Sequence, residues 1–194
     1  MAEIEYWDWP ASHYEKTDTV KEIEAILGLE FERVYSPDKI FQEEYPPSYH
    51  EVMNPVREMI KDDHGGHIFL GENMEVRGIN LYSKKIAPEK LQALLKFSLP
   101  DLQCLNLNET GLTTYTFTDR QPQLIFINLS QNPDLKSVPF EFTPTELVSL
   151  DMYDSGVEEI ALPAGMDKLV KIDIARNKLK KFSFGSGIRE LYLM

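Results

Sequence analysis

The segment Leu124-Ile125-Phe126-Ile127-Asn128-Leu129 decides the fold, because its spacing of apolar residues returns about every 22 residues from position 76 onward. Apolar side chains occupy the first, fourth and sixth positions of each copy. The copies are Val76-x-x-Ile79-x-Leu81, Leu102-x-x-Leu105-x-Leu107, Leu124-x-x-Ile127-x-Leu129, Leu147-x-x-Leu150-x-Met152, Leu169-x-x-Ile172-x-Ile174 and Ile188-x-x-Leu191-x-Leu193. One such unit cannot bury its apolar side alone, whereas stacked units share a continuous core.

These copies resemble the leucine-rich repeat family, and the resemblance covers roughly the last three-fifths of the chain. It implies an α/β fold built as a solenoid, with a short curved parallel sheet and a convex side of mostly extended segments and one helix. A small, mainly helical α/β cap region would precede the solenoid. We therefore expect an acidic N-terminal α/β region over residues 1–66 and a leucine-rich-repeat solenoid of about six strands over residues 67–194.

A polar ladder position comes shortly after the predicted strands and is occupied by Thr110, Asn132, Ser155 and Asn177. In the family that these repeats resemble, an asparagine there hydrogen-bonds backbone groups of adjacent coils, and threonine or serine substitutes in part. Buried loop backbone needs such partners. The resemblance therefore implies a structural role for these residues and not a catalytic one.

The other half of each coil has its own pattern of apolar residues. The groups are Leu112-x-x-Tyr115-x-Phe117, Leu135-x-x-Val138-x-Phe140, Val157-x-x-Ile160-x-Leu162 and Leu179-x-x-Phe182-x-Phe184. Pro139, Pro163 and the β-branched or aromatic neighbours predict short extended segments on the convex side. The first coil differs, because the run from Pro88 to Phe97 favours a helix with proline at its start.

The clearest element before the repeats is a helix. Thr17 or Asp18 is suited to cap its start, Gly28 is suited to end it, and Ile23 faces inward by helical spacing. After this helix, the alternation of apolar and polar residues over 29–35 predicts a short, half-buried strand.

Other elements before the repeats follow from proline positions and apolar runs. Helices are predicted from Pro37 and over residues 48–61, although Pro55 removes a backbone donor from the second. Residues 67–70 predict a strand that covers the open end of the first repeat. Residues 6–10 hold both tryptophans and are expected to anchor the terminus against a helix, with ligand binding as the alternative.

The acidic charge of the chain is confined to the region before the repeats. Residues 1–75 contain 18 Asp and Glu against 6 Lys and Arg, whereas residues 76–194 contain 14 of each. Such a surface repels nucleic-acid phosphates and anionic lipid headgroups, so we expect neither nucleic acid nor membrane as a partner. It favours a basic protein partner, and the alternative is that the charge serves solubility alone.

Cysteine content and hydropathy bear on the compartment. The lone cysteine, Cys104, excludes an internal disulfide framework and fits a reducing environment. The N-terminus lacks the basic start and apolar run of a signal peptide. No stretch approaches the ~18 apolar residues that span a bilayer. We therefore expect a cytoplasmic protein.

Signals of catalysis and of metal or cofactor binding are weak. His64 and His67, beside Asp62 and Asp63, are suitable ligands for Zn or Ni, but the two glycines between the histidines predict an exposed turn. Cys104 has no histidine nearby, and the chain has no nucleophile elbow or phosphate-binding glycine loop. We expect no enzymatic activity, no catalytic residue, no metal and no cofactor.

The residues between the leucine-type positions point outward and form columns on the predicted concave face. The candidate protein-binding residues are Tyr82, Asn106, Asn108, Phe126, Asn128, Asp151, Tyr153, Lys171, Asp173 and Tyr192. Strands ~4.8 Å apart give a face ~24 Å wide, which has room for a peptide, a loop or a helix. Phe126 and Tyr153 are predicted as exposed aromatic hot spots, and scattered aromatics without a role are the alternative.

These features predict a non-catalytic module that binds a protein or peptide. One alternative is an enzyme or a metal-binding N-terminal domain whose repeats select the substrate. Another is a structural fragment of a longer repeat protein. Because residues 191–194 lie inside the sixth strand, we expect either a longer natural protein or self-association through the uncovered strand edge.

Overall fold

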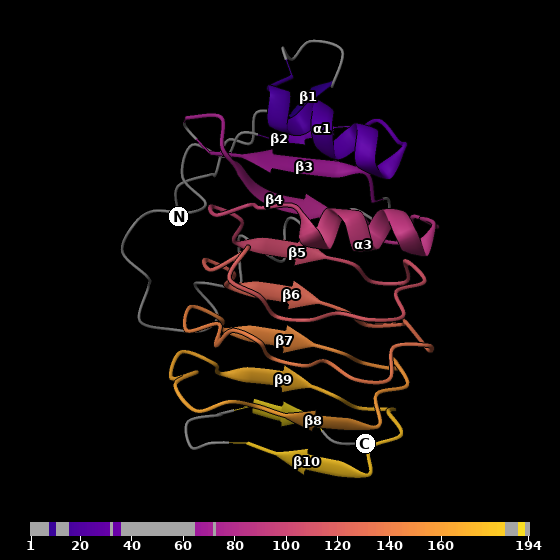
Figure 1. Cartoon of the computed structure of the whole chain (residues 1–194), viewed down its shortest axis with the longest axis vertical. Helices are drawn as coiled ribbons and strands as arrows, with labels where there is room; N and C mark the ends of the chain where they lie inside the picture. The colour runs from indigo at the N-terminus through magenta and orange to yellow at the C-terminus, as the bar shows by residue number, and fades with distance from the viewer. Residues whose placement is uncertain are drawn as a thin grey trace.

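The computed structural model describes residues 8–10, 16–31, 33–35, 65–71, 73–184 and 190–192. The chain forms an elongated solenoid whose strands stack along its long axis (Figure 1). The described helices are α1 (Asp18–Leu27) and α3 (Pro88–Lys96), and neither has the length and apolar character that a membrane crossing requires. The strands are β1 (Asp8–Pro10), β2 (Arg33–Tyr35), β3 (His67–Leu70), β4 (Val76–Asn80), β5 (Cys104–Asn106), β6 (Phe126–Asn128), β7 (Ser149–Asp151), β8 (Glu159–Ala161), β9 (Lys171–Asp173), β10 (Lys181–Ser183) and β11 (Glu190–Tyr192).

The main sheet has nine strands in the order β1-β2-β3-β4-β5-β6-β7-β9-β11. Every neighbouring pair from β4 to β11 is parallel. Strand pairing places the central apolar residues opposite one another, in the order Ile79, Leu105, Ile127, Leu150 and Ile172. All five are buried, so the predicted stacking of the repeats around one interior row is confirmed.

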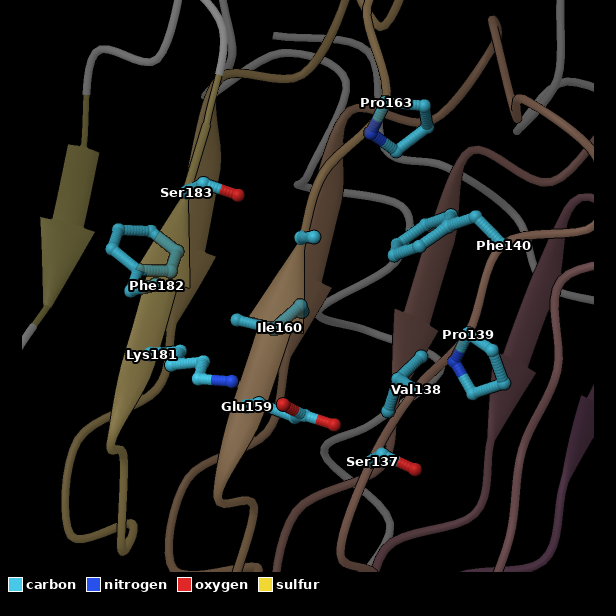
Figure 2. A pocket seen from close by; sticks show the side chains of 11 residues that line it. Ser137, Val138, Pro139, Phe140, Glu159, Ile160, Pro163, Lys181, Phe182 and Ser183 are labelled. Atoms are coloured by element: carbon cyan, nitrogen blue, oxygen red, sulfur yellow. The ribbon is translucent and has the colours of Figure 1, made fainter.

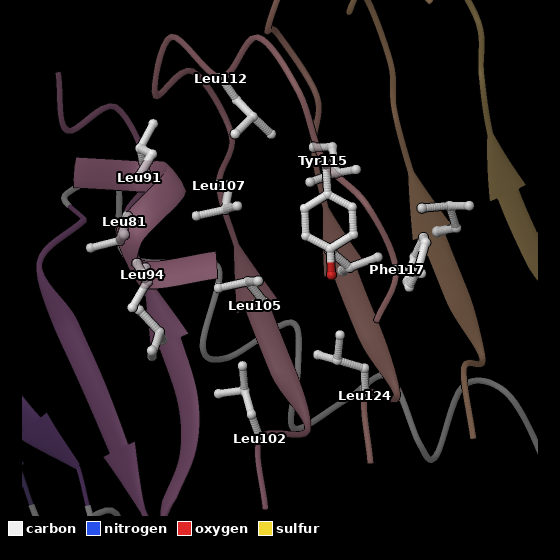
Figure 3. Close-up of a cluster of buried hydrophobic side chains, with 14 of the residues drawn as sticks. Leu81, Leu91, Leu94, Leu102, Leu105, Leu107, Leu112, Tyr115, Phe117 and Leu124 are labelled. Carbon is white, nitrogen blue, oxygen red and sulfur yellow. The ribbon is translucent and has the colours of Figure 1, made fainter. Parts of the chain in front are cut away.

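Side chains from the other half of each coil fill the core behind this row (Figure 3). Tyr115 and Phe117 are buried, with ring centroids 4.9 Å apart and planes at 80°. Phe117 also stacks on Phe140 of the next coil, at 4.6 Å and 4°. Such pairs contribute about 1 kcal/mol beyond the area that they bury. Because the rings come from successive coils, no single coil completes this part of the core.

Asn132 satisfies backbone groups of two coils at once. Its Oδ1 accepts hydrogen bonds from the N–H groups of Gly111 and Leu112, at 3.0 and 2.9 Å. Its Nδ2 donates to the carbonyls of Leu107 and Leu129, both at 2.9 Å. The two carbonyls also accept from the Thr110 and Ser155 hydroxyls, whereas the buried N–H of Leu112 depends on Asn132 for its partner.

Asn177 repeats this arrangement and accepts from the N–H groups of Ser155 and Val157. Thr110 and Ser155, at the equivalent position in the other coils, donate their hydroxyls to backbone carbonyls. The predicted ladder is therefore confirmed, with asparagine making more bonds than threonine or serine.

Each coil also turns at a residue in the left-handed region of backbone space. The five corner residues have φ between 53° and 57° and are Ser83, Glu109, Gln131, Asp154 and Arg176. Each lies two positions after the last apolar residue of its repeat. A non-glycine residue in this region costs about 1 kcal/mol. Its recurrence shows that the corner belongs to the geometry of the coil.

The half of each coil opposite the main sheet, termed the rear side, is extended as predicted. There β8 and β10 form a parallel two-stranded sheet. Isolated bridges join Phe117 to Phe140 and Ser137 to Glu159. The exception is α3, which occupies the rear side of the first coil and confirms the helix predicted from Pro88.

The strands before β4 continue the same sheet. β3 is antiparallel to β4, β2 is parallel to β3, and β1 is antiparallel to β2. The strand predicted over 67–70 is confirmed as β3. The helices predicted from Pro37 and over 48–61 lie outside the described residues, as do the side chains of residues 6–10.

Helix α1 confirms both predicted ends. The Thr17 side chain accepts from the N–H of Val20 at 3.3 Å, and Gly28 ends the helix with φ 66°. The strand predicted over 29–35 is too long, because residues 29–31 first close the helix. The Glu24 carbonyl accepts from Leu29 and its carboxylate from Phe31, so only β2 enters the sheet.

Candidate interaction surface

The predicted binding residues lie on the face of the main sheet that points away from the core, termed the outer sheet face. Strand pairing aligns one column of Gly78, Cys104, Phe126, Ser149, Lys171 and Glu190, and a second of Asn80, Asn106, Asn128, Asp151, Asp173 and Tyr192. The predicted alignment is thus confirmed. Tyr192 contributes its backbone to this pairing, and its side chain lies outside the described residues.

Most side chains of the second column form the turn that follows their strand. The Oδ1 atoms of Asn80, Asn106, Asn128 and Asp173 each accept from the N–H two residues further along, at 2.9–3.1 Å. This is an Asx turn, in which a side chain replaces a backbone acceptor. Asn106 and Asn128 are also buried. Asn106 and Asn128 are predicted binding residues, and their Oδ1 atoms are already occupied by the backbone of the turn.

Phe126 is buried, with 1% of its surface exposed. Cys104 and Ser149, which lie opposite it on the neighbouring strands, are buried as well. The prediction of an exposed hot spot at Phe126 is therefore wrong. Burial also raises the pKa of the Cys104 thiol, which disfavours the nucleophilic thiolate.

Asp151 departs from the turn pattern of its column. The N–H of Tyr153 donates to Ser130 Oγ at 3.1 Å, in place of an Asx turn to Asp151. Asp151 instead pairs with Lys171 on the adjacent strand, with Nζ 3.0 Å from Oδ1 and 3.1 Å from Oδ2. Burial raises the pKa of Asp151, Lys171 opposes that rise, and nearby Asp173 adds to it.

Tyr153 and Arg176 lie close to this ion pair. The Arg176 guanidinium carbon is 5.4 Å from the Tyr153 ring centroid, which is a cation–π distance. Tyr153, Lys171 and Asp173 are half-buried. We term Asp151, Tyr153, Lys171, Asp173 and Arg176 the charged cluster. The sequence prediction missed Arg176, although the repeat register places this corner residue one coil beyond Asp154 and beside the outer sheet face.

The opposite end of the outer sheet face offers fewer charged groups. Tyr82 and Asn108, both predicted binding residues, are half-buried there. Their backbone N–H groups donate to Asn80 and Asn106 in the turns described above. The predicted residues therefore do not form one uniform surface. The charged cluster at β7 and β9 is the part that combines charged and aromatic side chains that are not fully buried.

A separate groove of about 620 Å³ lies on the rear side, lined by residues 137–140, β8, Pro163 and β10. Figure 2 shows the side chains of Glu159 and Lys181 projecting from the neighbouring strands β8 and β10. No predicted binding residue lines this groove.

Of the two histidines that suggested a metal site, only His67 lies within the described residues. His64 lies outside the described residues, and His67 is a buried residue of β3. In the part of the chain that the structure describes, no group of three or more His, Cys, Asp or Glu side chains could hold a metal ion.

No family model matches the chain, and no solved structure matches it. Among curated proteins, the chain is similar to a Roc-COR-CHAT protease from an unknown prokaryotic organism, at 30% identity over 132 residues. The match covers 68% of this chain and 12% of that protein. The similarity therefore concerns a small part of a much longer protein.

Proposed function

We propose that this chain is a leucine-rich-repeat module that binds a protein or peptide and has no catalytic role of its own. The charged cluster carries the proposal, because Asp151 leaves the turn pattern of its column and pairs with Lys171 on the outer sheet face. The ladder of Asn132 and Asn177 supports the family assignment. In this proposal the strands before β4 cap the open end of the solenoid.

The proposed binding surface is the outer sheet face at β7 and β9. Tyr153 supplies an aromatic ring, Lys171 and Arg176 supply cations, and Asp173 supplies a carboxylate. Aromatic and arginine side chains near the centre of an interface provide much of its binding energy. The acidic charge of residues 1–75 favours a basic partner. A reducing, cytoplasmic location belongs to the same proposal, because the chain has a single, free cysteine.

The test compares partner capture by the wild-type chain with capture by Tyr153→Ala and Lys171→Ala variants. Each variant is expected to weaken binding of a verified partner by roughly 1–4 kcal/mol, while circular dichroism reports an unchanged fold. Glu89→Ala, at an exposed position on α3, is the matched control and should bind as the wild type does. Equal affinity of all four proteins would remove the outer sheet face from the proposal.

A second candidate follows from the similarity to part of a protease. In this version the module selects the protein that a larger, catalytic protein cleaves. The purified chain is then expected to bind that protein without cutting it, which mass spectrometry of the mixture can check. Cleavage by the chain alone, retained after repurification, would contradict a non-catalytic role.

A further inference from the structure

The outer sheet face is buried from β3 to β6, although it points away from the core. In its first column Phe69, Cys104 and Phe126 are each at most 3% exposed, and in its second column Asn80 and Asn106 are at most 4% exposed. Alternation along each strand sends these side chains to the face opposite the interior row of the repeats. The core therefore does not bury them, and a second layer must do so.

The described neighbours of Phe126 cannot form that layer. Its partners on the adjacent strands are Cys104 and Ser149, whose small side chains reach only the flanks of an aromatic ring. The described helices α1 and α3 pack on the other face of the sheet, where Ile23 and Leu91 belong to one apolar cluster. Because these exposures are those of the isolated chain, the cover comes from the chain itself.

Strand topology indicates which part of the chain crosses this face. β4 and β5 are parallel, and their connection passes over the rear side, where α3 lies. β2 and β3 are also parallel and step along the sheet in the same direction, but they run opposite to β4 and β5. Connections between parallel strands share one hand in nearly all proteins. With the strand direction reversed, a connection of the same hand must pass over the outer sheet face.

The connection from β2 to β3 contains residues 36–64, which lie outside the described residues. Five strand spacings separate β2 from β7, so a path out to β7 and back is ~48 Å long. These 29 residues reach about 100 Å when extended, so their length is sufficient. They also carry apolar side chains suited to a buried, uncharged face, such as Phe41, Val52 and Met59.

We propose that the outer sheet face from β3 to β6 is a docking surface for residues 36–64 of the same chain. The apolar side chains of this segment pack on Phe69, Cys104 and Phe126 and remove them from water. Burial decreases at β7 and β9, where Asp151 and Lys171 are half-buried. The segment thus leaves only that end of the face to other molecules. This proposal does not depend on whether the charged cluster binds a partner.

The lone cysteine reports on this face, because Cys104 lies beside Phe126 in the buried column. Alkylation of Cys104 by a maleimide should be slow in the wild-type chain, since the thiol is buried. Replacing residues 36–64 by a glycine-serine linker of about ten residues should accelerate alkylation about tenfold or more. Rapid alkylation of the wild type, or equally slow alkylation of both proteins, would overturn the proposal.

A thiol on the core side of the same sheet distinguishes an uncovered face from an unfolded chain. Ile127→Cys, made together with Cys104→Ser, places the thiol in the interior row. It should react slowly both with and without residues 36–64. Rapid alkylation there would show that the shortened chain has unfolded, and crosslinking in the whole chain then decides.

Photocrosslinking identifies the occupant in the whole chain. A benzophenone amino acid replaces Phe41, Tyr45 or Tyr49, one at a time, and mass spectrometry identifies the peptides that irradiation joins. At least one position should crosslink to β3, β5 or β6. Absence of such crosslinks from all three would overturn the proposal, and crosslinks from Tyr6 would then assign the cover to the N-terminus. Crosslinked dimers would show instead that a second copy covers the face.

Discussion

At Asp151, partial burial and a neighbouring cation act against each other. Burial disfavours the carboxylate, and the ammonium of Lys171 favours it, with burial as the larger effect on the pKa. Such a pair adds little to stability, because the cost of desolvation offsets much of the attraction.

The Asp151→Asn variant tests this balance through pH. The pKa of Asp151 in the folded chain is raised above the ordinary value of 3.8, so its contribution to stability is fully present below pH 3.8 and is lost as the pH rises through the folded-state pKa. We expect the free energy of unfolding of the wild type, minus that of the variant, to fall across this window and then level off. Urea denaturation at several pH values measures this difference. A difference that rises with pH would mean that Lys171 outweighs burial.

The Phe126→Ala variant tests burial on the outer sheet face. Removing a buried ring should lower the free energy of unfolding by about 3 kcal/mol or more. Phe184→Ala makes the same chemical change at a half-exposed ring and should cost about 1 kcal/mol or less. Urea denaturation of both variants gives the comparison. Small and equal losses in the free energy of unfolding would mean that the Phe126 ring is exposed.

At the scale of elements, the strands of this solenoid are too short to be stable alone. Strands β5, β6, β7 and β9 each have 3 residues. Backbone groups outside these short strands therefore need side-chain hydrogen bonds between coils. The ladder asparagines do this at the ends of the strands. Their contribution to the free energy of unfolding depends on how deeply they are buried, because water can replace a lost hydrogen bond only near the surface.

The Asn132→Ala variant measures the ladder. It leaves the N–H groups of Gly111 and Leu112 without their acceptor and removes one of two donors from the carbonyls of Leu107 and Leu129, so the free energy of unfolding should fall by about 3 kcal/mol. Asn177→Ala removes the equivalent bonds at a half-buried position and should cost less. Thermal and urea denaturation would compare the two. An equal or greater loss for Asn177→Ala would contradict the role of depth.

Elements with strong local signals could be predicted from the sequence. The apolar spacing predicts the stacked strands, and Thr17, Gly28 and Pro88 predict helix ends correctly, because these signals act within a few residues. The strand over 29–35 could not be bounded, since Glu24 captures Phe31 through a side-chain bond that no local pattern reveals. Strand β1 was missed for a related reason, because its pairing with β2 is long-range.

At the scale of the molecule, one sheet runs from β1 to β11, so the described strands before and after residue 66 share a hydrogen-bonded ladder. The repeat spacing predicted the alignment of the outer columns. It could not predict the burial of Phe126, because exposure depends on what surrounds a position. It also could not predict that Asp151 forms no Asx turn, because the N–H of Tyr153 donates to Ser130 of another coil. Sequence therefore predicted which residues lie in a row, but not which of them are free to bind.

Stability should vary along this sheet. Each coil contacts mainly its neighbours, so inner coils have support on both sides and outer coils on one. We expect amide hydrogens of β5, β6 and β7 to exchange more slowly than those of β10 and β11. Hydrogen exchange followed by mass spectrometry measures these rates. Uniform protection from β5 to β11 would indicate that the chain opens only as a whole.

The left-handed corner that recurs in every coil bears on how such a chain can gain or lose units. Because Gln131 and Asp154 share one backbone shape, excising residues 132–154 would join equivalent turns and leave the remaining leucines facing inward. A single residue inserted within a strand would instead move the side chains that follow it in that strand to the opposite face. The copies begin at positions 76, 102, 124, 147, 169 and 188, so the segments between strands already differ in length by single residues, and only the strand and its corner keep a fixed length.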